Sequence, residues 1–110
     1  MTAKRKEETC EAQLRRMCKD IADDISNDSH DGGISGASRW MEDIYSVRYI
    51  VDSEKKYLGA MLMVAGGGPT IWINTWTKEV EGSWGADRCT HHFRDEIGLD
   101  DYNEEMYNCI

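Results

Sequence analysis

The sequence of 110 residues contains one proline, one phenylalanine and no long apolar run. Its longest apolar stretch, residues 58–65, is far shorter than the roughly 18 residues expected of a membrane-spanning helix. The first residues are charged and no apolar segment follows them, so no secretory signal is predicted. We therefore expect a cytoplasmic protein without a membrane span. The length suits a single domain over residues 1–110.

Common catalytic and cofactor motifs are also missing. The triple glycine at 66–68 follows a predicted strand, but Pro69 and another strand come next. A phosphate loop would instead close with Gly-Lys-Ser/Thr or lead into a helix. A tight hairpin explains the glycines better, because glycine readily adopts positive φ. No Gly-x-Ser-x-Gly and no Cys-x-x-Cys occurs, so we expect neither a cofactor nor a metal ion.

The cysteines are few, and their spacing does not form a disulfide or zinc pattern. Cys10 and Cys18 would lie on one face of a helix about 12 Å apart, which is too far for a disulfide. We interpret the cysteines as small buried apolar residues. Cys89 and His91 should share one face of a strand, with His92 on the other. An enzyme that uses Cys89 or His91 would need a base and an acid to converge on them, and nothing local predicts this.

Apolar residues three and four apart predict a helix over residues 7–26, which loop-forming residues then end. Residues 34–42 give no clear pattern. From residue 44 the period changes to two, and a helix with Asp100 as its N-cap follows the last strand. Its apolar stripe would be Tyr102, Met106 and Cys109, or Leu99, Met106 and Ile110. The predicted strands are 44–51, 57–65, 70–75, 80–84 and a short one at 89–93.

This order of elements predicts an α+β fold. Four or five antiparallel strands form a meander that packs against an N-terminal and a C-terminal helix. In the first strand, alternation places Tyr45, Val47, Tyr49 and Val51 on one face and leaves the other face wet. The strand at 57–65 is uniformly apolar and should be central in the sheet.

Acidic residues outnumber basic ones, 21 to 13, for a net charge of −8. The excess lies in two blocks: residues 20–54 hold nine acidic and two basic residues, and residues 95–110 hold six acidic and no basic ones. A duplex-binding protein needs a basic footprint, so we do not expect direct nucleic-acid binding.

Carboxylates three or four positions apart on a helix lie about 5–6 Å from each other, a spacing comparable to that of phosphates along a strand. Such a row could occupy a Lys/Arg groove built for nucleic acid and gain the same charge-assisted hydrogen bonds. The alternative is that the charge only confers solubility. The candidate partner-binding residues are Asp20, Asp23, Asp24, Asp28, Asp31, Glu42, Asp43, Asp95, Glu96, Asp100, Asp101, Glu104 and Glu105.

Three tryptophans, Trp72, Trp76 and Trp84, lie in or beside one predicted hairpin. They either pack within the fold or form an exposed aromatic contact surface. The glycine turn beside Trp72 and Trp84 also suggests an alternative function, a module that binds or sequesters a small ligand such as a signalling nucleotide.

Residues 67–75 read Gly-Gly-Pro-x-Ile-x-Ile-x-Thr, and residues 80–85 read Val-x-Gly-x-Trp-Gly. With the acidic C-terminal helix, this half of the chain, residues 57–110, resembles a group of short proteins of bacteriophages and mobile elements. The resemblance implies an inhibitor of host defence, such as an anti-CRISPR or anti-restriction protein. It brings no catalytic residues with it.

The charge pattern and the resemblance together predict a non-enzymatic anti-CRISPR protein that acts in the cytoplasm of a host bacterium. Its partner would be a CRISPR effector or another nucleic-acid-binding defence protein, whose basic groove the acidic surface would fill. The sequence leaves open a homodimer and does not identify the target.

Overall fold

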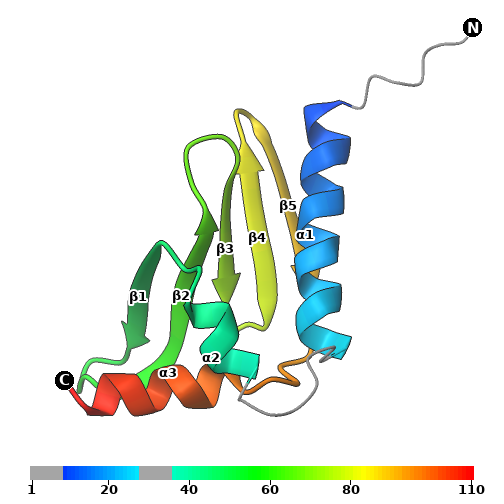
Figure 1. Ribbon diagram of the computed structural model, residues 1–110. Helices are drawn as coiled ribbons and strands as arrows, with labels where there is room; N and C mark the ends of the chain where they lie inside the picture. Colours follow the sequence, from blue (N-terminus) through cyan, green and yellow to red (C-terminus); the bar gives the residue numbers. More distant parts are fainter. Residues whose placement is uncertain (1–8, 28–35) are drawn as a thin grey trace, which may run out of the picture.

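The computed structural model describes residues 9–27 and 36–110. Its five strands form one antiparallel sheet in the order β1-β2-β3-β4-β5 (Figure 1). The predicted α+β fold, a meander with an N-terminal and a C-terminal helix, is therefore confirmed. Residues 36–41, which lie in the segment without a clear sequence pattern, form the short helix α2. The elements are α1 (Cys10–Asn27), α2 (Gly36–Met41), β1 (Ser46–Val51), β2 (Tyr57–Ala65), β3 (Thr70–Asn74), β4 (Glu79–Trp84), β5 (Asp87–His92) and α3 (Leu99–Asn108).

Helix α1 packs its apolar stripe onto β4 and β5. The stripe arises because residues three and four apart share a helix face, and Leu14, Cys18 and Ile25 on it are fully buried. Gly82 of β4 lies directly beneath the helix. A Cβ atom at Gly82 would lie 2.6 Å from the Cys18 sulfur and 2.9 Å from Leu14 Cδ1. The missing side chain is what allows α1 to approach the sheet so closely.

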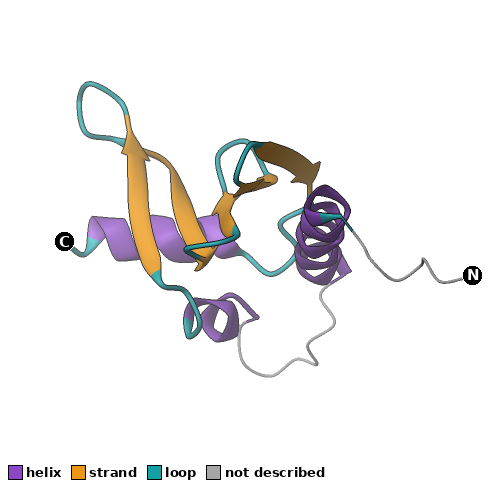
Figure 2. Ribbon diagram, turned by 90° about the horizontal axis from the view of Figure 1, so that it is seen from above, coloured by secondary structure: helices purple, strands orange, loops and turns teal. Residues whose placement is uncertain are grey.

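The helices cover the apolar face of the sheet. Leu62 pairs with Ile73, and Ile73 pairs with Val80, so these three fully buried side chains form one row across β2, β3 and β4. Helix α1 covers the β4–β5 end, and α3 packs against β2 (Figures 1 and 2). Trp72 points to the opposite face, as the period-two pattern predicts. None of the helices in the described parts is long and apolar enough to cross a membrane.

The glycine run connects β2 to β3 as a hairpin, as the sequence predicts. Gly67 there has a φ of 100°, in the region that only glycine adopts without strain. Strand β2 is hydrogen-bonded on both sides and lies inside the sheet.

Strand β1 lies at the edge of the sheet, and most of its predicted dry face is exposed. Tyr45 is 75% exposed, and Val47 and Val51 are also exposed. Only Tyr49 is partly covered, because the ring of Tyr107 in α3 lies 5.2 Å away. The predicted burial of the other three is wrong, since β1 is an edge strand and α3 covers it at Tyr49, through the ring of Tyr107.

Helix α3 begins differently from the prediction. Its N-cap is Gly98, with a φ of 78° and no side-chain cap, and not Asp100. The capping bonds come from Asp95, whose carboxylate accepts hydrogen bonds from the backbone nitrogens of Leu99 at 2.7 Å and Asp100 at 2.8 Å. The left-handed Gly98 turns the chain so that this earlier carboxylate reaches the free N–H groups.

The buried side of α3 consists of Leu99 and Asn103. The Asn103 amide nitrogen donates to the Leu99 carbonyl at 2.8 Å, which satisfies this donor, whereas the buried Asn103 Oδ1 has no hydrogen-bond partner within the described residues. The predicted apolar stripe is wrong at Met106, Cys109 and Ile110, which are all exposed. These side chains do not face the sheet, because α3 turns Leu99, Asn103 and Tyr107 toward it instead.

We predict that Gly59→Ala destabilises the fold. A Cβ atom at Gly59 would lie 2.5 Å from Trp76 Cβ and 2.9 Å from the Trp76 backbone nitrogen. Because backbone blocks the new methyl group, we expect the free energy of unfolding in urea to fall by about 2 kcal/mol or more. Gly68→Ala is the control, since its nearest atom would be the Trp84 indole nitrogen at an ordinary 3.6 Å. Equal losses in the two variants would contradict this account.

Candidate functional site

A groove of about 480 Å³ lies between α1, α2 and the part of β2 and β3 that adjoins their hairpin. Its walls are mostly apolar, and its charged groups are three carboxylates and one guanidinium. The lining residues are Met17, Ile21, Asp24, Arg39, Trp40, Glu42, Asp43, Ile44, Val64, Ala65 and Ile71.

Two separate parts of the first acidic block meet at this groove. Asp24 follows Ile21 by three positions and therefore lies beside the apolar stripe of α1. Glu42 and Asp43 follow α2 directly. Their backbone nitrogens donate to the carbonyls of Arg39 at 3.2 Å and Trp40 at 3.3 Å, so the helical turn carries both acids to the groove.

The groove carboxylates have no partner among the described residues. Asp24, Glu42 and Asp43 are exposed, and within residues 9–27 and 36–110 their carboxylates form no hydrogen bond or ion pair. The same holds for Asp20, one turn before Asp24. All three groove acids lie at or just after the C-terminal end of a helix, where the dipole disfavours negative charge. Two further predicted contact residues lie outside the described residues: Asp28 and Asp31.

Other predicted contact residues have partners within the fold. The Asp23 carboxylate pairs with Lys19 at 2.8 Å across one helical turn. Asp95 caps α3, as described above. The Glu96 carboxylate lies 3.7 Å from the Arg94 guanidinium. These carboxylates are therefore less available to a partner than those at the groove.

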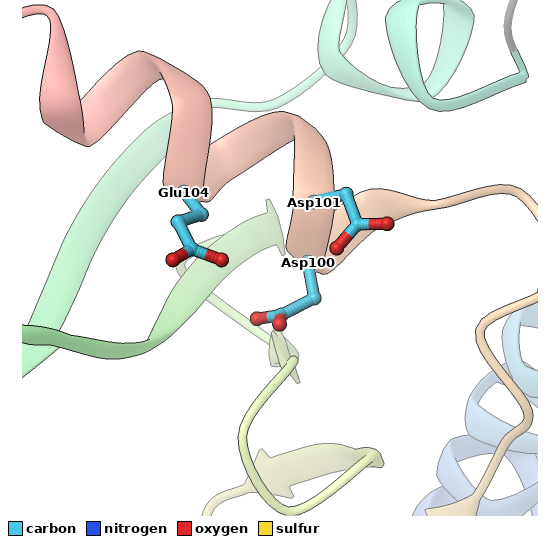
Figure 3. A group of neighbouring side chains, drawn as sticks. All are labelled: Asp100, Asp101 and Glu104. Atoms are coloured by element: carbon cyan, nitrogen blue, oxygen red, sulfur yellow. The ribbon is translucent and has the colours of Figure 1, made fainter.

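The C-terminal acids gather on another part of the surface, along α3 (Figure 3). The donor oxygens of Asp100, Asp101 and Glu104 lie within 4.8 Å of one another, an arrangement that could in principle hold a metal ion. Asp101, Glu104 and the nearby Glu105 are exposed, whereas Asp100 is half-buried.

Hydrogen bonds to Asp100 explain why it faces inward. Its Oδ1 accepts hydrogen bonds from the Tyr57 hydroxyl at 2.9 Å and the Thr75 hydroxyl at 2.8 Å. The Thr75 oxygen in turn accepts the backbone N–H of Ala60 at 2.8 Å. Burial, and then the Asp100 carboxylate, raises the pKa of the Tyr57 hydroxyl, which keeps it protonated as a donor. Asp100 thus ties α3 to β2 and to the end of β3.

We predict that Asp100→Ala lowers the free energy of unfolding by about 2–3 kcal/mol, because the buried Thr75 hydroxyl loses its acceptor and the Tyr57 hydroxyl keeps only the Asp100 backbone carbonyl, at 3.3 Å. Urea unfolding monitored by tryptophan fluorescence measures this change. Asp101→Ala, its exposed neighbour, should change stability by less than about 0.5 kcal/mol. If Asp100→Ala left the free energy of unfolding unchanged, the hydrogen-bond network would not stabilise the fold.

The three tryptophans do not form one surface. Trp72 lies on the helix-free face of the sheet, with the Arg48 guanidinium 5.0 Å from its ring centroid. Trp84 packs against the core on the opposite face. Trp76 is 54% exposed in the turn after β3. Trp72 and Trp84 therefore lie on opposite faces of the sheet. A ligand site shared by both at the glycine turn would need them on one face.

A second cleft, of about 270 Å³, opens between α1 and β5. Two of the four cysteines meet there: the sulfur atoms of Cys18 and Cys89 lie 3.3 Å apart. The sequence could not predict this pair, because it joins a helix to a strand 71 positions later. The lining residues are Arg15, Arg16, Cys18, Lys19, Cys89, Thr90 and His91.

The cysteines and histidines only partly follow the predictions. Cys18 is buried as expected, but Cys10 and Cys109 are exposed, so the prediction of burial is wrong for them. Cys89 and His91 do share a face, since both line the cleft. His92 points to the other side, 3.3 Å from the Glu79 carboxylate. No Asp or Glu is among the residues that line the cleft, so a Cys–His–acid arrangement is not assembled there.

Comparisons of the chain with protein-family models, curated proteins and solved structures found no match.

Proposed function

We propose that the protein is a non-enzymatic inhibitor that binds a basic, nucleic-acid-binding surface of a partner protein through the groove between α1 and α2. The carboxylates of Asp24, Glu42 and Asp43 carry the proposal. They come from two segments, surround one groove and have no partner among the described residues.

The groove has the chemistry that lysine and arginine side chains need. Its apolar wall, which includes Met17, Ile21 and Trp40, can pack against the methylene stems of such side chains. The carboxylates can then accept charge-assisted hydrogen bonds from the cationic heads. A protein groove that binds phosphates offers these same cations, so this surface competes with nucleic acid for them. The net charge of −8 would also speed association with a basic partner.

The partner that we propose is a CRISPR effector of a bacterial host, in whose cytoplasm the protein would act. This choice is supported by the resemblance of residues 57–110 to phage and mobile-element proteins. A restriction enzyme is the alternative target, since it too holds DNA in a basic channel. Both targets need the same acidic surface.

We predict that reversing the groove charges abolishes inhibition. The assay measures binding of a labelled target duplex to each member of a panel of purified, guide-loaded CRISPR effectors by fluorescence anisotropy. The wild-type protein should prevent one of these effectors from binding the duplex. The variant Asp24→Lys, Glu42→Lys and Asp43→Lys should bind that effector at least 100-fold more weakly, because three attractive contacts become repulsive. Wild-type binding should weaken steeply with added salt.

The matched control reverses three acids of α3 by the same total charge: Asp101→Lys, Glu104→Lys and Glu105→Lys. It should keep most of the inhibition, because these residues lie away from the groove. Equal loss in both triple variants would mean that net charge, and not the groove, drives binding. Full inhibition by the groove variant would exclude the groove as the site.

A further inference from the structure

We propose that Cys18 and Cys89 form a redox-active dithiol, which a small anionic disulfide such as oxidised glutathione converts to an intramolecular disulfide. Their sulfur atoms lie 3.3 Å apart in the cleft between α1 and β5. A disulfide bond is about 2.05 Å long, so the sulfurs need to approach by little more than about 1 Å. This modification is independent of the partner-binding groove on the other edge of α1.

Gly82 creates the space in which the two sulfurs meet. It is the register partner of Cys89 in the β4–β5 pair. The Cys18 sulfur occupies the position that a side chain at 82 would fill, only 2.6 Å from the ideal Cβ. The close approach of α1 thus brings the helix cysteine beside the strand cysteine.

The two thiols differ in access, which assigns their roles. Cys18 is fully buried, whereas Cys89 is half-buried and lines the cleft. Burial, and then the contact with Cys89, raises the pKa of the Cys18 thiol to about 12. Cys89 is therefore the sulfur that an external reagent meets first, and Cys18 reacts second.

The reaction is a thiol–disulfide exchange in two steps. The Cys89 thiolate attacks one sulfur of oxidised glutathione, forms a mixed disulfide and releases one glutathione thiolate. The Cys18 sulfur, on losing its proton, attacks Cys89 and expels the second glutathione, which takes up a proton. Two protein thiols are oxidised to one disulfide, and one glutathione disulfide is reduced to two glutathione molecules.

The charge around the cleft favours an anionic reagent. Arg15, Lys19 and His91 line it, and no carboxylate is among the lining residues. Arg15 and Lys19 each pair with one acid of α1, Glu11 and Asp23, at 2.8 Å. The cleft nevertheless gathers all three basic side chains of α1, Arg15, Arg16 and Lys19, in a chain of net charge −8.

The test uses the full chain with Cys10→Ser and Cys109→Ser, which removes the two exposed thiols. After incubation with oxidised glutathione, intact mass spectrometry should show the loss of two hydrogen atoms and no retained glutathione. Peptide mapping without reductant should join the Cys18 and Cys89 peptides. Because the bond closes a loop of about 70 residues, the Tm should rise on the order of 10 °C.

Two comparisons make the test specific. The rate of each disulfide with the protein is divided by its rate with a free cysteine peptide. This ratio should be several-fold higher for oxidised glutathione than for the uncharged 2-hydroxyethyl disulfide. Added salt should remove the difference. Adding Cys89→Ser to the same background should prevent the mass loss. The proposal is overturned if the mapped protein retains glutathione on Cys89, or if both thiols stay reduced while the protein remains folded.

Discussion

The close packing of α1 on β4 is the contact on which the other surfaces depend. It requires a glycine at position 82, because any side chain there would displace Cys18 and Leu14. When the apolar stripe of α1 packs over Gly82, the positions of the side chains on either side of that stripe are fixed as well. Asp24 faces the groove beside α2, and Lys19 lies beside β5. One helix–sheet contact therefore positions both an acidic and a basic surface.

The acidic residues divide into two groups by what they contact. Asp95 and Asp100 accept hydrogen bonds that begin α3 and tie it to the sheet. Asp24, Glu42 and Asp43 have no such partner in the described residues, and they lie at helix ends where negative charge is unfavourable. A group of residues that local stability does not favour is most simply explained by function. This contrast is what distinguishes the groove from the rest of an acidic protein.

Local patterns predicted the architecture well. Alternation placed β2 within its observed bounds and put Trp72 opposite Ile71 and Ile73, and the glycine run gave the hairpin. These features depend on neighbours along the chain. The role of Asp100 was not predictable, because it depends on Thr75 and Tyr57, which only the tertiary fold brings near it.

The same limit applies to the candidate sites. Sequence reasoning selected Asp24, Glu42 and Asp43 among thirteen acids, but charge alone could not separate them from Asp95 and Asp100. The contact between Cys18 and Cys89 depends on the register of β4 and β5 and on the angle of α1. Local sequence patterns predict neither of these. The one available clue was Gly82, a glycine within a strand, which often marks the close approach of another element.

The central claim is that the groove carboxylates serve binding and not folding. Urea unfolding at low salt tests this directly on the variant with Asp24→Asn, Glu42→Gln and Asp43→Asn, which keeps shape but removes charge. The account predicts a free energy of unfolding equal to that of the wild type or higher by up to about 1 kcal/mol, because unfavourable charges leave the helix ends. A loss of more than about 1 kcal/mol would contradict it, since the carboxylates would then be part of what holds the fold together.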